Sequence, residues 1–190
     1  METDTFYNLH KKYAPSEKIL DLVWSHSLNV EGIVKKIIAD HPELQIKEDL
    51  ARAGAIAHDI GVYLVEPCSC HKKGREKSKE PYIKHGVIGA DIIRNEGLGK
   101  EVALMVERHI GTGISKEQIL KNNLPLPVKD FIPKTLEEKL VGYADNFHSK
   151  KPKFNSYAEI KKDLSHYGEE SVQRLEECKK IFGIPEIKNI

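Results

Sequence analysis

Six potential metal ligands stand at positions where an apolar helical pattern calls for core residues: His26, His58, Asp59, His85, His109 and Asp145. Two of them are adjacent in the segment AIAHDIGVY, residues 55–63, at the end of an apolar run. Burying so many unrelated polar groups in one small domain would be costly. One shared metal site accounts for all six, because neutral imidazole and carboxylate groups suit first-row transition metals.

The number of candidate ligands favours two ions over one. Six protein ligands are more than a single ion usually takes while it keeps an open position. Two ions about 3.5–4 Å apart could share the carboxylate of Asp59, with water or hydroxide between them. The ligand types fit Fe, Mn, Co, Ni or Zn, of which Fe or Mn is favoured. Asp59 would also be the catalytic residue, because it would position the hydroxide and could accept its proton.

Three further side chains are candidates for contact with a substrate. Lys84 and Arg108 are next to His85 and His109, and either cation could meet a phosphate. A solvated surface charge is the alternative for each. His148 lies near Asp145 and could contact the leaving group or orient a ligand. The remaining histidines lie in polar or boundary contexts and are expected in solvent: His10, His41, His71 and His166.

The elements that must position these residues are helical almost throughout. Apolar periodicity predicts helices over about 16–40, 47–60, 82–96, 99–110 and 115–123, with Gly61 as the stop after the second. TLEE at 135–138 and SYAE at 156–159 match the capping box and predict two more helix starts, the latter opening a helix or helix pair that ends at Gly183. No strand and no element before residue 16 is predicted, so the expected class is all-α.

The segment between the second and third helices has no periodicity. Residues 66–81 contain HKKGREKSKE, a basic stretch that could act as a lid over an anionic substrate or be a solvated loop. The same loop carries Cys68, Cys70 and His71, a weak candidate for a separate structural metal site.

Composition limits the classes of protein that the chain can belong to. The 190 residues suit one domain with a terminal extension, and 30 Lys and Arg nearly balance 29 Asp and Glu. This balance argues against a dedicated nucleic-acid binder. No apolar run approaches a membrane span and no signal peptide is recognised. With three cysteines in 190 residues, we expect a cytoplasmic protein with reduced thiols, monomeric or homodimeric.

The ordered set His26, His58-Asp59, His85, His109 and Asp145, with HDIG at 58–61, resembles the HD-domain metal-dependent phosphohydrolases of the HDIG subgroup. Its binuclear branch includes HD-type diadenosine tetraphosphatases, and small uncharacterised HDIG proteins typical of archaea are also similar. The resemblance implies a helical bundle with metals held among the helices. It further implies that His26, His58 and Asp145 hold one ion, that His85 and His109 hold the other, and that Asp59 bridges them. Residues 1–149 would form this domain and 150–190 a helical extension.

Two departures from the family bear on the substrate. Relatives in the binuclear branch often carry a phosphate-binding lysine where this chain has Val62. No GYP follows HDIG, which argues against a cyclic-di-nucleotide phosphodiesterase.

The resemblance therefore implies hydrolysis of a nucleotide or another small phosphate ester or anhydride by a hydroxide that bridges the metals. The alternatives are a di-iron oxygenase with nearly the same ligands, or a nucleotide sensor that keeps its metals without turnover.

Overall fold

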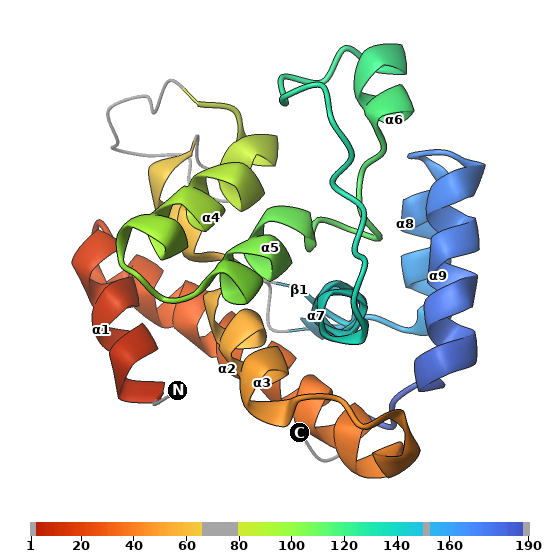
Figure 1. The fold of residues 1–190 in the computed structure, drawn as a ribbon, viewed down its shortest axis with the longest axis horizontal. Helices are drawn as coiled ribbons and strands as arrows, with labels where there is room; N and C mark the ends of the chain where they lie inside the picture. Colours follow the sequence, from red (N-terminus) through yellow and green to blue (C-terminus); the bar gives the residue numbers. More distant parts are fainter. Residues whose placement is uncertain (1–2, 66–79, 150–152, 188–190) are drawn as a thin grey trace.

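The computed structural model describes residues 3–65, 80–149 and 153–187. Within these ranges the chain forms α1 (Thr3–Tyr13), α2 (Glu17–Asp40), α3 (Glu48–Ala57), α4 (His85–Asn95), α5 (Lys100–Arg108), α6 (Lys116–Lys121), α7 (Leu136–Asn146), α8 (Tyr157–Ser165) and α9 (Glu169–Phe182) (Figure 1). Short 3₁₀ turns cover Pro42–Leu44, Ile60–Leu64 and Tyr82–Lys84. The basic stretch and the Cys68, Cys70 and His71 cluster lie outside the described residues.

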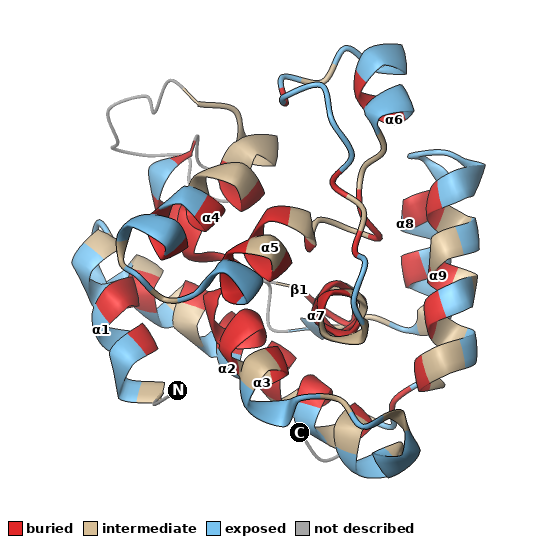
Figure 2. Ribbon diagram, viewed as in Figure 1, coloured by how far each residue is buried: buried red, intermediate tan, exposed pale blue. Residues whose placement is uncertain are grey.

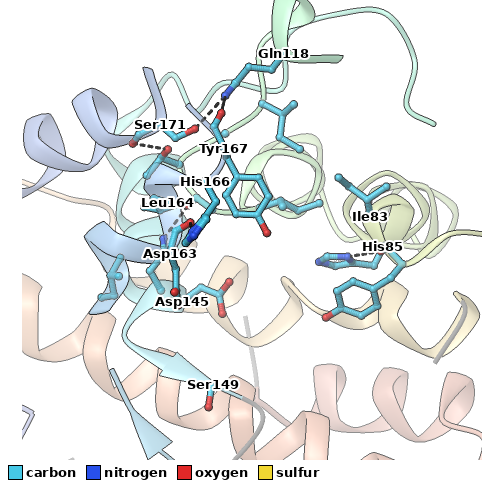
Figure 3. A pocket seen from close by; sticks show the side chains of 18 of the residues that line it. Ile83, His85, Gln118, Asp145, Ser149, Asp163, Leu164, His166, Tyr167 and Ser171 are labelled. Carbon is cyan, nitrogen blue, oxygen red and sulfur yellow. Dashed lines mark hydrogen bonds between the residues drawn. The ribbon is translucent and has the colours of Figure 1, made fainter. Parts of the chain in front are cut away.

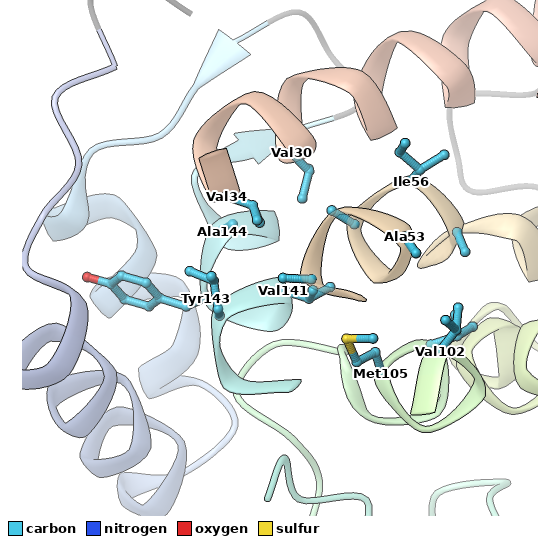
Figure 4. Packing of buried hydrophobic residues seen from close by; sticks show 14 of the residues in the cluster. Val30, Val34, Ala53, Ile56, Val102, Met105, Val141, Tyr143 and Ala144 are labelled. Atoms are coloured by element: carbon cyan, nitrogen blue, oxygen red, sulfur yellow. The ribbon is translucent and has the colours of Figure 1, made fainter. Parts of the chain in front are cut away.

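Helix α3 is the centre of the bundle. It packs against α2, α5 and α7, while α4 lies on α5 and on the 3₁₀ turn Ile60–Leu64. Figure 2 shows the buried residues on the inward faces of these helices. Figure 4 shows Ala53 and Ile56 of α3 between side chains of its neighbours, among them Val30, Met105 and Val141. Small alanines let several helices approach one short helix without leaving voids.

The N-terminal helix α1 was not predicted, and the expectation that His10 is in solvent is wrong. Phe6, Leu9 and His10 face the core, and His10 is completely buried. Its Nδ1 contacts the Tyr63 hydroxyl at 2.8 Å and its Nε2 contacts the Ile56 carbonyl at 3.0 Å. Burial lowers the pKa of His10 to about 4, so this histidine is a neutral part of the core at pH 7.

The two predicted capping boxes have different outcomes. Ser156 and Glu159 form the complete reciprocal pair at the start of α8, as predicted. Thr135 accepts a hydrogen bond from the Glu138 amide at the start of α7. The Glu138 carboxylate, however, accepts from the Lys134 amide and from Arg108 at 2.8 Å each. The second capping box is therefore only half formed, because the half-buried Arg108 competes for the carboxylate.

The all-α class is confirmed with one small addition. A two-stranded antiparallel pair follows α7, with β1 (His148–Ser149) bonded to β2 (Lys153–Phe154). Sequence periodicity cannot detect strands of this length, because alternation needs about four residues or more to show. No helix in the described part of the chain is long and apolar enough to cross a membrane.

Helices α8 and α9 share the core of the bundle. Leu164, Leu175 and Phe182 are buried in the same apolar cluster as the residues of α2, α3 and α7. The Tyr143 hydroxyl donates a hydrogen bond to the Gly183 carbonyl at 2.7 Å, and Gly183 ends α9 as predicted. The division of the chain into two units at residue 149 stays a prediction. The apolar core continues across this position.

Gly61 acts through close packing and not as a helix stop. Helix α3 ends at Ala57, earlier than predicted, and Gly61 lies in the following 3₁₀ turn. A Cβ atom at Gly61 would lie 2.0 Å from the His85 carbonyl oxygen and 2.6 Å from the Gly89 amide nitrogen. The backbone at the start of α4 therefore rests directly on Gly61, and this contact sets the position of His85.

We expect Gly61→Ala to lower the free energy of unfolding by about 1–3 kcal/mol, because the added methyl group meets backbone that cannot rotate away. Gly54→Ala is the matched control, since its methyl group would meet the flexible side chain of Met105. Urea denaturation of both variants measures the difference. Equal stability of the two would contradict this account of Gly61.

Candidate metal centre

The six candidate ligands come from five helices. Four of these helices contribute residues that lie at or next to a helix end. His58 and Asp59 follow α3, His85 begins α4, His109 follows α5 and Asp145 lies in the last turn of α7. His26 comes from the middle of α2. The structure thus brings together all six candidate ligands that the sequence indicated. The first and the last of them are 119 positions apart in the sequence.

Three of the four imidazoles are held in the same way. The Nδ1 atoms of three histidines contact the carbonyl oxygen three residues earlier: His58 to Ala55 at 2.7 Å, His85 to Tyr82 at 2.7 Å and His109 to Val106 at 2.8 Å. The last carbonyls of a helix lack partners within the helix, so the imidazoles of His58 and His109, which follow α3 and α5, can each satisfy one of them. A carbonyl only accepts, so Nδ1 carries a proton in each ring, and the three Nε2 atoms point inward.

One group of ligand atoms surrounds His26. Its Nε2 lies 3.1 Å from the Nε2 of His58 and 3.0 Å from the Oδ1 of Asp145. The distance from His58 Nε2 to the same Oδ1 is 3.3 Å. About 3 Å is the separation of neighbouring ligands that each lie about 2.1 Å from one ion.

A second group is formed by His85 and His109, whose Nε2 atoms are 3.1 Å apart. Asp59 lies between the two groups and faces each with a different oxygen. Its Oδ1 is 3.6 Å from His85 and 3.8 Å from His109. Its Oδ2 is 3.4 Å from the Nε2 of His26 and 3.5 Å from that of His58.

The electrostatics of the cluster call for a cation. Burial would lower the pKa of His58, but the carboxylates of Asp59 and Asp145 overcome it and raise that pKa to about 10. Burial and repulsion from His58 and His85 lower the pKa of His109 to about 3. Burial would raise the pKa of Asp145, yet His58 and His26 hold it well below the usual range. The Asp145 carboxylate thus retains its charge and attracts a positive partner.

The donor set fits a divalent metal ion. His85 and His109 both donate their Nδ1 protons to carbonyls, so their Nε2 atoms face each other at 3.1 Å. Two such nitrogens repel unless a proton or a metal ion lies between them. Because the pKa of His109 is about 3, this ring holds no second proton at pH 7, and its Nε2 keeps a lone pair for a metal ion. A divalent cation removes this repulsion and neutralises the carboxylates.

Asp145 marks the open side of the cluster. Its side chain is 22% exposed, whereas those of the other five ligands are at most 6% exposed. A cavity of about 800 Å³ lies on this side, lined by His26, His85, Asp145 and His148 together with residues of α6, α8 and their neighbouring turns (Figure 3). Cavities of this size accommodate small organic ligands.

His148 lines the cavity and also contacts His26. The two Nδ1 atoms are 2.8 Å apart, and the rings stack at 5.1 Å. Phe154 of β2 packs against His148 from the other side. In mid-helix the carbonyls near His26 are used by the helix itself, so His148 takes the place of the carbonyl that positions each of the other three rings. The sequence was compatible both with this orienting role for His148 and with a contact between His148 and the substrate.

Lys84 and Arg108 are not brought to the cavity. Lys84 donates to Glu80 at 2.6 Å, and Arg108 donates to the buried carboxylate of Glu138 at 2.8 Å. Neither belongs to the described lining. Adjacent helical residues point about 100° apart, so a residue next to an inward-facing ligand points elsewhere. Val62, the position of the expected lysine, is half-buried against the apolar core.

A model of the HD-domain family matches residues 23–150, which contain all six candidate ligands. The chain belongs to the HD-domain family. The HDIG segment and the later histidines therefore identified the family correctly from residue types and order alone.

Curated relatives match this chain over part of their own length. An uncharacterised protein of Methanocaldococcus jannaschii is 42% identical over 102 residues, which is 54% of this chain and 50% of that protein. The tRNA (cytidine(56)-2'-O)-methyltransferases of Thermoplasma volcanium and Picrophilus torridus are 36% and 35% identical over 135 and 134 residues, 71% and 70% of this chain. Those matches cover 33% of each methyltransferase. The chain thus spans half or less of these relatives.

Solved structures show the same fold. The HD domain of the L. monocytogenes phosphodiesterase PgpH is similar with a TM-score of 0.55 and 16% sequence identity, over 93% of this chain and 94% of that one. The same domain in complex with cyclic-di-AMP gives a TM-score of 0.54 at 16% identity, over 92% of each chain. At this identity the likeness concerns the arrangement of helices.

We expect His148→Leu to weaken metal binding by about 10–100-fold, because His26 loses the acceptor that fixes its tautomer. His148→Asn should stay close to the native affinity, since its amide oxygen can occupy the place of Nδ1. Competition with a metal-chelating dye measures the affinity, and thermal denaturation of the metal-free variants controls for folding. Equal affinities of the Asn and Leu variants would contradict the role of His148.

Proposed function

We propose that the protein is a metal-dependent phosphohydrolase that acts on a nucleotide or another small phosphate ester or anhydride. The observation that carries this proposal is the carboxylate of Asp59, which faces one group of imidazoles with each oxygen. The cluster borders a cavity of about 800 Å³. Membership in the HD-domain family supports the reaction class. The cyclic-di-AMP bound by the similar PgpH domain supports a nucleotide as ligand.

We assign two ions to the cluster. His26, His58 and Asp145 would hold one, His85 and His109 the other, and Asp59 both. A pair of divalent ions supplies a water of lowered pKa at neutral pH and positive charge for phosphoryl oxygens. The ligand types favour Fe or Mn, and admit Co, Ni or Zn.

The chain's own residues set the direction of approach. Asp145 forms the exposed edge of the cluster, so a phosphoryl group enters from the cavity past this carboxylate. His58, Asp59 and His109 lie at the buried back, where side chains of α3 and α5 exclude bulk water. Asp59 would therefore act on the side of the phosphoryl group away from the cavity, where it can orient the attacking water.

Elemental analysis should find about two transition metal ions per chain. Asp59→Ala should lose both, because both groups share this carboxylate, whereas His85→Ala should lose mainly one. Asp21→Ala is the control, since Asp21 is an exposed aspartate of α2 outside the cavity lining. Identical metal content of the Asp59 and His85 variants would contradict the shared carboxylate.

Metal-loaded protein should release phosphate from at least one member of a panel of nucleoside mono-, di- and triphosphates, dinucleotides and p-nitrophenyl phosphate. Asp59→Ala should abolish this release, and removal of oxygen should leave it unchanged. Release that requires oxygen would indicate the oxygenase alternative. Metal-loaded protein without release from any substrate would refute the proposed activity.

A further inference from the structure

The far side of the cavity is built by residues beyond the family match. The family model ends at residue 150, whereas Asn155, Asp163, Leu164, His166, Tyr167 and Ser171 line the cavity, and the last five lie across it from His85 (Figure 3). We name these six residues the distal wall. Its chemistry bears on the part of a substrate that extends away from the metal cluster.

The distal wall is firmly attached to the bundle. Arg174 of α9 donates to the carbonyls of Thr112 and Gly113 at 3.0 Å each, and to Gln118 at 2.9 Å. The amide group of Gln118 donates in turn to the Tyr167 carbonyl at 2.9 Å and to the Ser171 hydroxyl at 3.0 Å. A side-chain network with every partner satisfied holds its parts in one arrangement. The distal wall is therefore preformed for a ligand.

Two asparagines present acceptors to the cavity. The Nδ2 of Asn146 donates to the carbonyls of Gly111 and Gly142 at 2.8 and 2.7 Å. The Nδ2 of Asn155 donates to the Asn146 carbonyl at 3.0 Å. Carbonyls only accept, so these contacts fix the orientation of both amides and leave each Oδ1 for other partners. Hydroxyl and amino groups of a ligand are the complementary donors.

The charge of the lining is negative. The described lining contains no lysine or arginine, while Asp163 adds an exposed carboxylate to that of Asp145. A second phosphate placed in this half would meet like charge without a counter-ion from the described residues, which disfavours it. The only strong attraction for a phosphoryl group in the described cavity is therefore at the metal cluster.

An aromatic side chain completes the distal wall. Tyr167 is 67% exposed, and its ring extends from the turn between α8 and α9 into the cavity toward the side of Ile83 and His85 (Figure 3). Leu164 lies beside it, and Ile83 lies across the cavity. An exposed tyrosine over an apolar floor is suited to stacking against a planar ring.

We propose that the distal wall is a specificity site for the nucleoside part of a nucleoside monophosphate, with Tyr167 as the stacking residue and Asp163 as the group that excludes a second phosphate. This inference rests on the proposed function, which places the single phosphoryl group at the metals. Asn146 and Asn155 accept hydrogen bonds from sugar hydroxyls or base amino groups. The site thereby separates monophosphates from diphosphates and from phosphorylated sugars.

Binding of hydrolysis-resistant phosphonate analogues to the metal-loaded protein tests this inference without turnover. The analogues of the four ribonucleoside 5′-monophosphates, of ribose 5-phosphate and of the corresponding diphosphates are titrated calorimetrically. The best nucleoside analogue should bind about tenfold more tightly than the ribose analogue, and Tyr167→Ala should remove this preference. A preference that survives Tyr167→Ala, or no preference in the native protein, would overturn the stacking role.

Asp163→Lys should make the diphosphate analogue bind about tenfold more tightly relative to the monophosphate, because it replaces a like charge by an opposite one. Asp21→Lys is the matched control, with the same change of charge on an exposed residue outside the lining. An unchanged ratio in Asp163→Lys, or an equal change in Asp21→Lys, would overturn the role of Asp163. Because binding is read without hydrolysis, loss of the proposed activity and loss of this specificity are separate outcomes.

Discussion

The convergence of imidazole and carboxylate groups in a buried space is the constraint on which this structure depends. The Nε2 atoms of His85 and His109 point at one another because both Nδ1 protons are committed to carbonyls. Such an arrangement is unfavourable without a cation and has no purpose in an ordinary core. The surrounding helices hold it in place, and they do so largely through their ends, where unused carbonyls can fix an imidazole.

The same constraint explains features that look unrelated in the sequence. Gly61 lets the start of α4 rest on the turn after α3, which brings His85 to Asp59. The short β1–β2 pair places His148 between His26 and Phe154, so the one ligand from mid-helix gains a fixed partner as well. Both features position a candidate ligand, His85 or His26, that helix geometry alone would not hold in place.

The sequence predicted which polar residues lie together better than it predicted their surroundings. Residues such as His26 and Asp145 could be recognised because polar groups on an apolar face need a shared explanation, and HDIG supplied the family. The roles of Lys84 and Arg108 could not be predicted, because sequence adjacency does not reveal that Glu80 and Glu138 take up their charges. Helix α1 was missed since its apolar face consists of few residues, and one of them is the buried His10. The distal wall depends on contacts such as that of Gln118 with Ser171, 53 positions apart, which no local pattern contains.

Because the six candidate ligands come from five helices, a metal site built from them would exist only when all of those helices are docked. A bound ion therefore acts as a cross-link that closes most of the chain, from position 26 to position 145, and the opening of one helix would release it. Local fluctuations that other proteins tolerate become linked here to the loss of the ion. The core of this protein would then unfold as one cooperative unit, with the concentration of free metal in its surroundings setting how often it opens.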